Sequence, residues 1–271
     1  MHYTTYFLTL APLALALPQN APATQTQTAS APWNTDAGFN AVLDPAIQKD
    51  WYRDFNATSA GQTSPSTQLI NPSHNGVWNP AINNWLTWSN MWELHEPEIK
   101  RASKDKLPDS NVLKNAIENQ SFKSKVDARL ILSLFLNEAA GNVAIGCNKL
   151  NGVACGMFQM MGGRKFDNAG ATLEEKLNNM IRDMLYGNHI AVGQANGTPG
   201  YLDIMSGNKQ IFWKNPTKQI WSGNPFGAAR FYTGGDAPNY DLTVGNGDKN
   251  YVSKFASRLV GWQDPWAPEV N

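Results

Sequence analysis

The sequence predicts a mainly α-helical protein with a loop-rich and Trp-rich N-terminal extension. Between residues 126 and 262, apolar side chains recur at helical spacing in segments that end at glycine-containing turns. The alternation of apolar and polar residues that marks a half-buried strand is scarce. The chain has 271 residues, enough for one domain once both ends are discounted. Hydrophobic residues make up 42% of it, which excludes a chain disordered throughout.

The two ends of the chain are expected to lie outside the folded domain. Residues 6–17 form an uncharged apolar run that contains the cleavage pattern Ala14-Leu15-Ala16. This run is too short to span a bilayer, so it predicts a secretory signal peptide over 1–16 and an extracellular protein. Residues 17–32 carry no charge and no aromatic side chain, which predicts a disordered leader. Residues 263–271 are expected to be a C-terminal tail. After the N-terminal apolar run, no segment of the chain is apolar enough to predict a membrane partner.

The composition and the absence of certain motifs limit the partners and cofactors that the chain is expected to bind. The chain has 22 Lys and Arg against 22 Asp and Glu, and this zero net charge argues against a nucleic-acid partner. The only cysteines, Cys147 and Cys155, favour a disulfide in a secreted chain. The four histidines are scattered and no Gly-rich phosphate loop is present, so we expect no metal and no cofactor. We also expect a monomer. Three sequons, at Asn56, Asn119 and Asn196, fit a glycoprotein.

Residues 33–125 predict a loop-rich extension that packs on the domain formed by residues 126–262. Four tryptophans lie close together in it: Trp78, Trp85, Trp88 and Trp92. They admit two interpretations, core packing or a platform on which sugar rings stack, and core packing is the simpler. Residues 91–104 predict a helix that Pro97 breaks or kinks.

Four helices are predicted in the second half of the chain. Residues 126–140 are apolar on nearly all sides and end at Gly141-Asn142. The second helix opens at Thr172, with Glu175 three residues on, as in a capping box, and ends at Gly187. The third opens at Asn224 with Pro225 in the first helical position, and the fourth carries Tyr251, Phe255 and Leu259 four residues apart and ends at Gly261.

Glu138 is the most informative residue of the first of these helices. It follows Ile131, Leu134 and Phe135 by seven, four and three positions, so it shares their apolar face. It also lies in the last turn, where the helix dipole disfavours a negative charge. Burial and dipole both raise the pKa of such a carboxyl. A carboxylic acid that stays protonated near neutral pH is suited to general-acid cleavage of a glycosidic bond.

Four motifs accompany this glutamate in a fixed order. Glu138-Ala139-Ala140-Gly141-Asn142 is followed by Gly156-Met157-Phe158-Gln159, with Gln159 21 positions after Glu138. Residues 228–234 read AARFYTG and residues 251–262 read YVSKFASRLVGW. Together they resemble the motifs of glycoside hydrolase family 23, the goose-type lysozymes and soluble lytic transglycosylases. The last motif is similar to the closing helix of secreted fungal members.

The resemblance covers about half the chain and implies a lysozyme-like catalytic domain over 126–262. It implies that Glu138 is the catalytic acid and that five residues line the sugar cleft: Gly156, Phe158, Gln159, Tyr232 and Thr233. Gln159 would bind the sugar, whereas Tyr232 and Phe158 remain open between cleft and core. The disulfide between Cys147 and Cys155 would pin the intervening loop. Ala139, Thr233 and Lys254 depart from the usual Ser, Asn and Asp, which leaves chitin open beside peptidoglycan as the polysaccharide substrate.

The chemistry of cleavage depends on how many carboxylates take part. A lytic transglycosylase needs Glu138 alone, because the C6 hydroxyl of the sugar closes a 1,6-anhydro ring. An inverting hydrolase needs a second carboxylate to activate water. Asp167, Asp203 and Asp236 are candidates, Asp167 foremost, although each also fits a surface or turn aspartate. The alternative function is a non-catalytic carbohydrate-binding or effector protein on the same scaffold.

Overall fold

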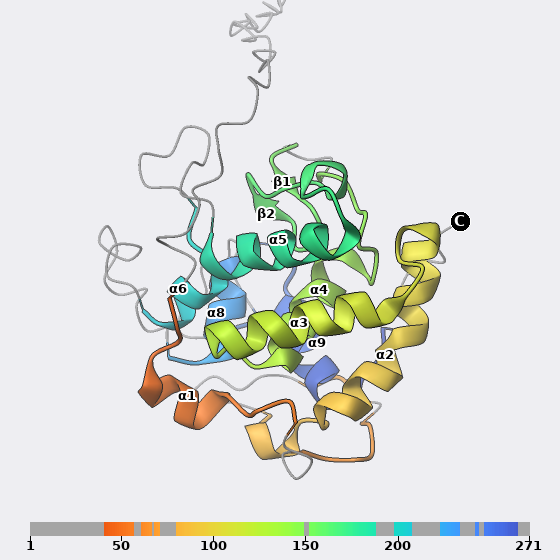
Figure 1. Cartoon of the computed structure of the whole chain (residues 1–271). Coiled ribbons are helices and arrows are strands. Elements are labelled where there is room, and N and C mark those ends of the chain that lie inside the picture. Colours follow the sequence, from red (N-terminus) through yellow and green to blue (C-terminus); the bar gives the residue numbers. More distant parts are fainter. Residues whose placement is uncertain are drawn as a thin grey trace, which may run out of the picture. The chain divides into compact units, whose positions relative to one another are not determined.

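The computed structural model describes residues 41–56, 61–66, 68–70, 80–148, 152–187, 198–207, 223–233, 242–243 and 247–264. Within these ranges the protein is mainly helical and holds one two-stranded antiparallel ribbon, which confirms the prediction of a mainly α-helical protein (Figure 1). The expected signal peptide, the expected leader and most of the expected tail lie outside the described residues. No helix in the described ranges is long and apolar enough to cross a bilayer.

The elements follow one another in a simple order. The α-helices are α1 (Pro45–Trp51), α2 (Trp88–Ser103), α3 (Ser110–Ser124), α4 (Ala128–Ala139), α5 (Leu173–Tyr186), α6 (Tyr201–Met205), α8 (Pro225–Tyr232) and α9 (Tyr251–Leu259). Short 3₁₀ turns are η1 (Ile82–Asn84), η2 (Lys104–Lys106) and η3 (Phe166–Asn168). The ribbon consists of β1 (Ala154–Cys155) and β2 (Met160–Met161), with Cys155 opposite Met160.

Side-chain caps explain where three helices begin, and two of these caps were predicted. The side chain of Thr172 accepts a hydrogen bond from the backbone N–H of Glu175, and the Glu175 carboxylate accepts one from the N–H of Thr172, so the capping box of α5 is confirmed. Asn224 caps α8, with Pro225 in the first turn as predicted. Helix α4 begins at Ala128, two residues later than predicted, because the carboxylate of Asp127 accepts the N–H of Arg129 and caps the helix there.

The N-terminal extension is more helical than predicted. Helix α2 runs through Pro97 without ending there, and α3 was not predicted at all. The helix expected over residues 91–104 lies largely within α2, whereas the expectation of loops is wrong for residues 110–124. The spacing of apolar residues does not reveal α3, because about half of its buried face is polar. The polar residues of that face are Ser110, Gln120, Ser121 and Ser124.

The clustered tryptophans belong to the core. Trp85, Trp88 and Trp92 are at most 5% exposed, which confirms core packing for these three and excludes a sugar platform built from them. Trp78 lies outside the described residues. The Nε1–H of Trp85 donates to the carbonyl of Pro80 at 2.9 Å, so even its polar atom is used internally.

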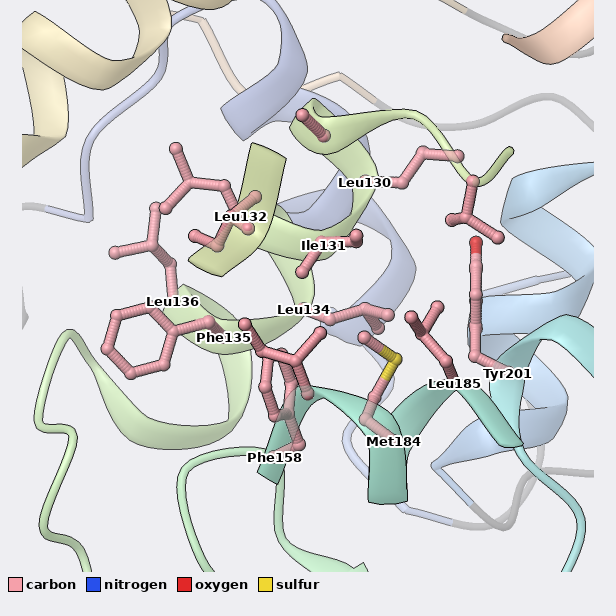
Figure 2. Close-up of a cluster of buried hydrophobic side chains, with 14 of the residues drawn as sticks. Leu130, Ile131, Leu132, Leu134, Phe135, Leu136, Phe158, Met184, Leu185 and Tyr201 are labelled. Atoms are coloured by element: carbon pink, nitrogen blue, oxygen red, sulfur yellow. The ribbon is translucent and has the colours of Figure 1, made fainter. Parts of the chain in front are cut away.

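Helix α4 lies in the centre of the core. Every residue from Ala128 to Leu136 is buried, and α2, α3 and α9 pack against it. Helices α3 and α5 also lie side by side, so contacts cross the predicted boundary at 125/126, which itself stays a prediction. Figure 2 shows the apolar side chains of α4 meeting Phe158, Met184, Leu185 and Tyr201. Because α4 is enclosed in this way, the position of its C-terminal end is fixed.

Candidate functional site

Glu138 lies where the buried helix α4 reaches the surface. Asn137 and Glu138 are the two residues of α4 that are not buried, and both are partly exposed. The chain then turns through Ala140 and Gly141, which both have positive φ. The Ser103 hydroxyl of α2 donates to the Gly141 carbonyl at 2.8 Å and fixes this turn. The carboxyl group of Glu138 is therefore carried by rigid backbone at the edge of the core.

Tyr251, the first residue of α9, is the direct partner of this carboxyl group. Its hydroxyl donates a hydrogen bond to Oε1 of Glu138, with the two oxygens 2.5 Å apart. Tyr251 is 6% exposed, and burial together with the charge of Glu138 raises its pKa well above the usual value. The tyrosine therefore stays a donor throughout the neutral range.

The environment raises the pKa of Glu138 from its ordinary value of 4.5 to about 7. The cause is burial, because removing a carboxylate from water disfavours its charged form. The hydrogen bond from Tyr251 acts in the opposite direction and offsets only part of this effect. Some of the side chain remains exposed, yet enough protein surrounds the carboxyl for desolvation to dominate. At neutral pH, both protonation states of Glu138 are accessible.

The raised pKa of Glu138 predicts that the free energy of unfolding depends on pH. Between pH 4.5 and 7 the folded protein keeps a proton on Glu138 that the unfolded chain has lost. The contribution of Glu138 to the free energy of unfolding is therefore fully present below pH 4.5 and is lost as the pH rises through about 7. The loss amounts to at most about 1.4 kcal/mol per pH unit. Urea unfolding of the wild type and of Glu138→Gln across this range should show a steeper loss in the wild type. Parallel curves would contradict the raised pKa.

Two further tyrosines, Tyr232 and Tyr201, lie near Tyr251. Burial and, to a smaller extent, the charge of Glu138 raise the pKa of Tyr232 well above its usual value, and the ring of Tyr201 packs edge-on against Tyr232 with centroids 6.2 Å apart. The Tyr232 hydroxyl does not contact Glu138; it donates to the backbone carbonyl of Phe158 at 2.9 Å. Tyr232 therefore connects α8 to the turn that follows β1.

That turn is held by a disulfide and by Gln159. Cys147 and Cys155 are bonded, which confirms the predicted pairing. Gln159 has a φ of +46°, and its Nε2 donates to the carbonyls of Gly146 (2.8 Å) and Gly156 (2.9 Å). Both amide hydrogens are thus used inside the loop, and the partly exposed side chain retains only its carboxamide oxygen for a sugar.

The other residues expected to line a cleft have different positions. The side chain of Phe158 is 1% exposed and packs against Phe135, so it belongs to the core and not to a surface that a sugar contacts. Gly156 is buried, with a φ of +72° and its backbone against Arg164. Thr233 is partly exposed and ends α8.

The structure describes two of the three candidates for a second carboxylate. Asp167 is exposed in η3, Asp203 is partly exposed in α6, and Asp236 lies outside the described residues. Among the described residues, the influences on the pKa of Glu138 are burial and the Tyr251 hydroxyl, and neither is a carboxylate.

Sequence reasoning missed a second buried acid with a raised pKa. Asp183 of α5 is 2% exposed, pairs with Nη2 of Arg164 at 2.9 Å and accepts the Arg164 backbone N–H at 3.0 Å. Burial raises its pKa to about 6 although Arg164 opposes the rise. Glu138 was located as an acid on the apolar face of a helix. The same signal could have located Asp183, which lies beside Met180 and Met184 in the apolar stripe of α5. Asp183 anchors the loop that supports Gly156.

Two cavities lie away from this site. One of about 300 Å³ is lined by Thr63, Pro65, Leu86, Asn90, Glu93 and Leu94. The other, of about 460 Å³, is lined by Gln62, Ser64, Ser66, Ile70, Pro80, Asn84 and Val260. Among the residues that the structure describes, no three His, Cys, Asp or Glu side chains gather as a metal site would require.

Comparisons of the chain with family models, with curated proteins and with solved structures found no match.

Proposed function

We propose that the protein is a secreted glycosidase that cleaves β-1,4 bonds in N-acetylhexosamine polymers, peptidoglycan or chitin. The proposal assigns Glu138 as the general acid and base of a lysozyme-like domain. The observation that supports it most is the Glu138 carboxyl at the end of a buried helix, with a pKa of about 7 and a tyrosine donor. The resemblance of the surrounding motifs to glycoside hydrolase family 23 supports the same assignment, and the disulfide and the apolar N-terminal run support secretion.

In the proposed reaction, protonated Glu138 gives its proton to the glycosidic oxygen as the bond from C1 to that oxygen breaks. An oxocarbenium-like centre forms at C1. The carboxylate left behind keeps its hydrogen bond from Tyr251, which becomes stronger when the acceptor is charged. Glu138 then accepts the proton of the C6 hydroxyl as that oxygen bonds to C1. The products are a 1,6-anhydro sugar and a chain with a free hydroxyl, and no water is consumed.

The placement of carboxylates supports this one-carboxyl route over an inverting hydrolysis. Inversion needs a second carboxylate roughly 6.5–9.5 Å away to activate water. Of the candidates, Asp167 is exposed in η3, and among the described residues the Tyr251 hydroxyl is the one side chain that shifts the pKa of Glu138. We therefore propose the anhydro product, with hydrolysis as its competitor.

Two observations favour the alternative of a non-catalytic carbohydrate-binding protein. Neither cavity described above is lined by Glu138, and the amide hydrogens of Gln159 are used within the loop. A binding protein would retain affinity for the polymer without cleaving it. The presence of Glu138 with a raised pKa favours the enzyme.

Product analysis by mass spectrometry tests the proposal. The purified protein is incubated with peptidoglycan and, separately, with chitin oligomers. Fragments lighter by one water than the hydrolytic products would support the transglycosylase route, and hydrated fragments would identify a hydrolase. Binding without cleavage of either polymer would favour the non-catalytic alternative.

A further inference from the structure

Tyr251 is held at two points by consecutive residues of α4. Its hydroxyl donates to Oε1 of Glu138, and its backbone carbonyl accepts a hydrogen bond from Nδ2 of Asn137 at 2.9 Å. Tyr251 is also the first residue of α9 and carries no side-chain cap before it. Because the carbonyl is anchored at the helix start, the ring of Tyr251 extends from a fixed point toward Glu138.

The orientation of Asn137 is set from the other side by Arg258. Arg258 lies seven residues after Tyr251 on α9, two helical turns along, so both face α4. Its Nε donates to Oδ1 of Asn137 at 3.0 Å, which assigns the amide nitrogen of Asn137 to the Tyr251 carbonyl. Nη2 of Arg258 also lies 3.4 Å from the carbonyl of Leu136 in the last turn of α4.

The charge of Arg258 is balanced inside the protein. Arg258 is 2% exposed, and its Nη1 lies 3.9 Å from Oε2 of Glu98 on α2. Nδ1 of the fully buried His95 lies 3.5 Å from the same carboxylate oxygen. A buried guanidinium is retained only when it is paired, and this one uses its Nε–H to bind Asn137.

We propose that Asn137 is a positioning residue, which fixes Tyr251 against Glu138 and is itself oriented by Arg258. Asn137 does not touch the carboxyl group of Glu138 in any described contact; it acts through Tyr251. Its removal frees the start of α9 and lengthens or breaks the Tyr251 to Glu138 hydrogen bond, while Glu138 stays on α4. The assignment rests on the proposed role of Glu138, but its test does not require the protein to cleave a sugar.

The test is a double-mutant cycle read by carboxyl ¹³C NMR titration of Glu138 in the full chain. The Glu138 signal is assigned by its disappearance in Glu138→Gln. The Tyr251 hydrogen bond lowers the pKa of Glu138, so Tyr251→Phe should raise it. Asn137→Ala should raise it in the same direction, by about 0.5 pH unit. In the Tyr251→Phe background, Asn137→Ala should then change almost nothing, because its path to Glu138 is already gone.

The matched control is Asn115→Ala, an exposed asparagine on α3, which should leave the titration of Glu138 unchanged. Thermal unfolding of each variant verifies that it is folded. An Asn137→Ala titration identical to the wild type would overturn the proposal, even if the variant were less stable. Equal shifts in the wild-type and Tyr251→Phe backgrounds would overturn it as well, because Asn137 would then act by another path. An enzyme that failed to cleave either polymer would leave these results standing.

Discussion

Replacing Glu138 with glutamine is expected to reduce cleavage of the responsive polymer by about a thousandfold or more, since a general acid contributes roughly 10²–10⁴-fold and here the same group also serves as base. Glutamine keeps the size of the side chain and can still accept the Tyr251 hydroxyl, but it has no proton to give to the glycosidic oxygen. Initial rates of fragment release at saturating polymer measure the effect.

The matched control is Glu174→Gln, an exposed glutamate in the first turn of α5. It removes the same charge without touching the site and should leave the rate unchanged. Binding of the polymer by Glu138→Gln should be close to that of the wild type. A Glu138→Gln rate within tenfold of the wild type would mean that another group donates the proton.

The second large effect is expected at Gly156. A Cβ atom there would lie 2.2 Å from the carbonyl oxygen of Arg164, and the backbone has a φ of +72°. That carbonyl cannot move freely, because the Arg164 N–H and guanidinium are both bound to buried Asp183. Gly156→Ala should therefore lower the free energy of unfolding by about 3 kcal/mol or more, from the positive φ and the steric overlap together.

Gly152→Ala separates these two contributions. Gly152 has nearly the same φ, +66°, but a Cβ atom there would meet nothing within 4 Å. Its replacement should cost only the backbone term, about 1–2 kcal/mol. Urea unfolding of both variants measures the difference. Equal losses would show that the contact between Gly156 and Arg164 is not tight, and that the turn carrying Gln159 tolerates a side chain.

The parts of the fold that follow from local rules were predictable. Helices α5 and α8 combine apolar patterns with side-chain caps, so their starts follow from the sequence. The apolar pattern located α4 as well, but its start was displaced by two residues because the Asp127 cap was not predicted. Helix α3 has a buried face that is half polar, which periodicity does not detect. Its hydrogen bonds to neighbouring elements, such as that from Gln120 to Asn178 of α5, exist only in the folded chain.

The candidate site was predictable to the same extent. An acid on the apolar face of a buried helix marks Glu138 in the sequence alone. Its partner Tyr251 lies 113 residues away and is identified only when α9 packs on α4. Gln159 and Phe158 show the limit of motif reasoning. Their spacing suggests contact with a sugar, whereas the structure uses the Gln159 amide to hold the loop together and encloses the Phe158 ring in the core.

The titration of Glu138 itself tests the central claim most directly. The claim is that one carboxyl group, held protonated up to neutral pH by burial, is able to act as acid and then as base. Carboxyl ¹³C NMR of the wild type against Glu138→Gln gives the pKa of this residue without any assumption about substrate. The account predicts a value of about 7. A value near the ordinary 4.5 would mean that Glu138 is a solvated carboxylate, and the assignment of a general acid to this position would be contradicted.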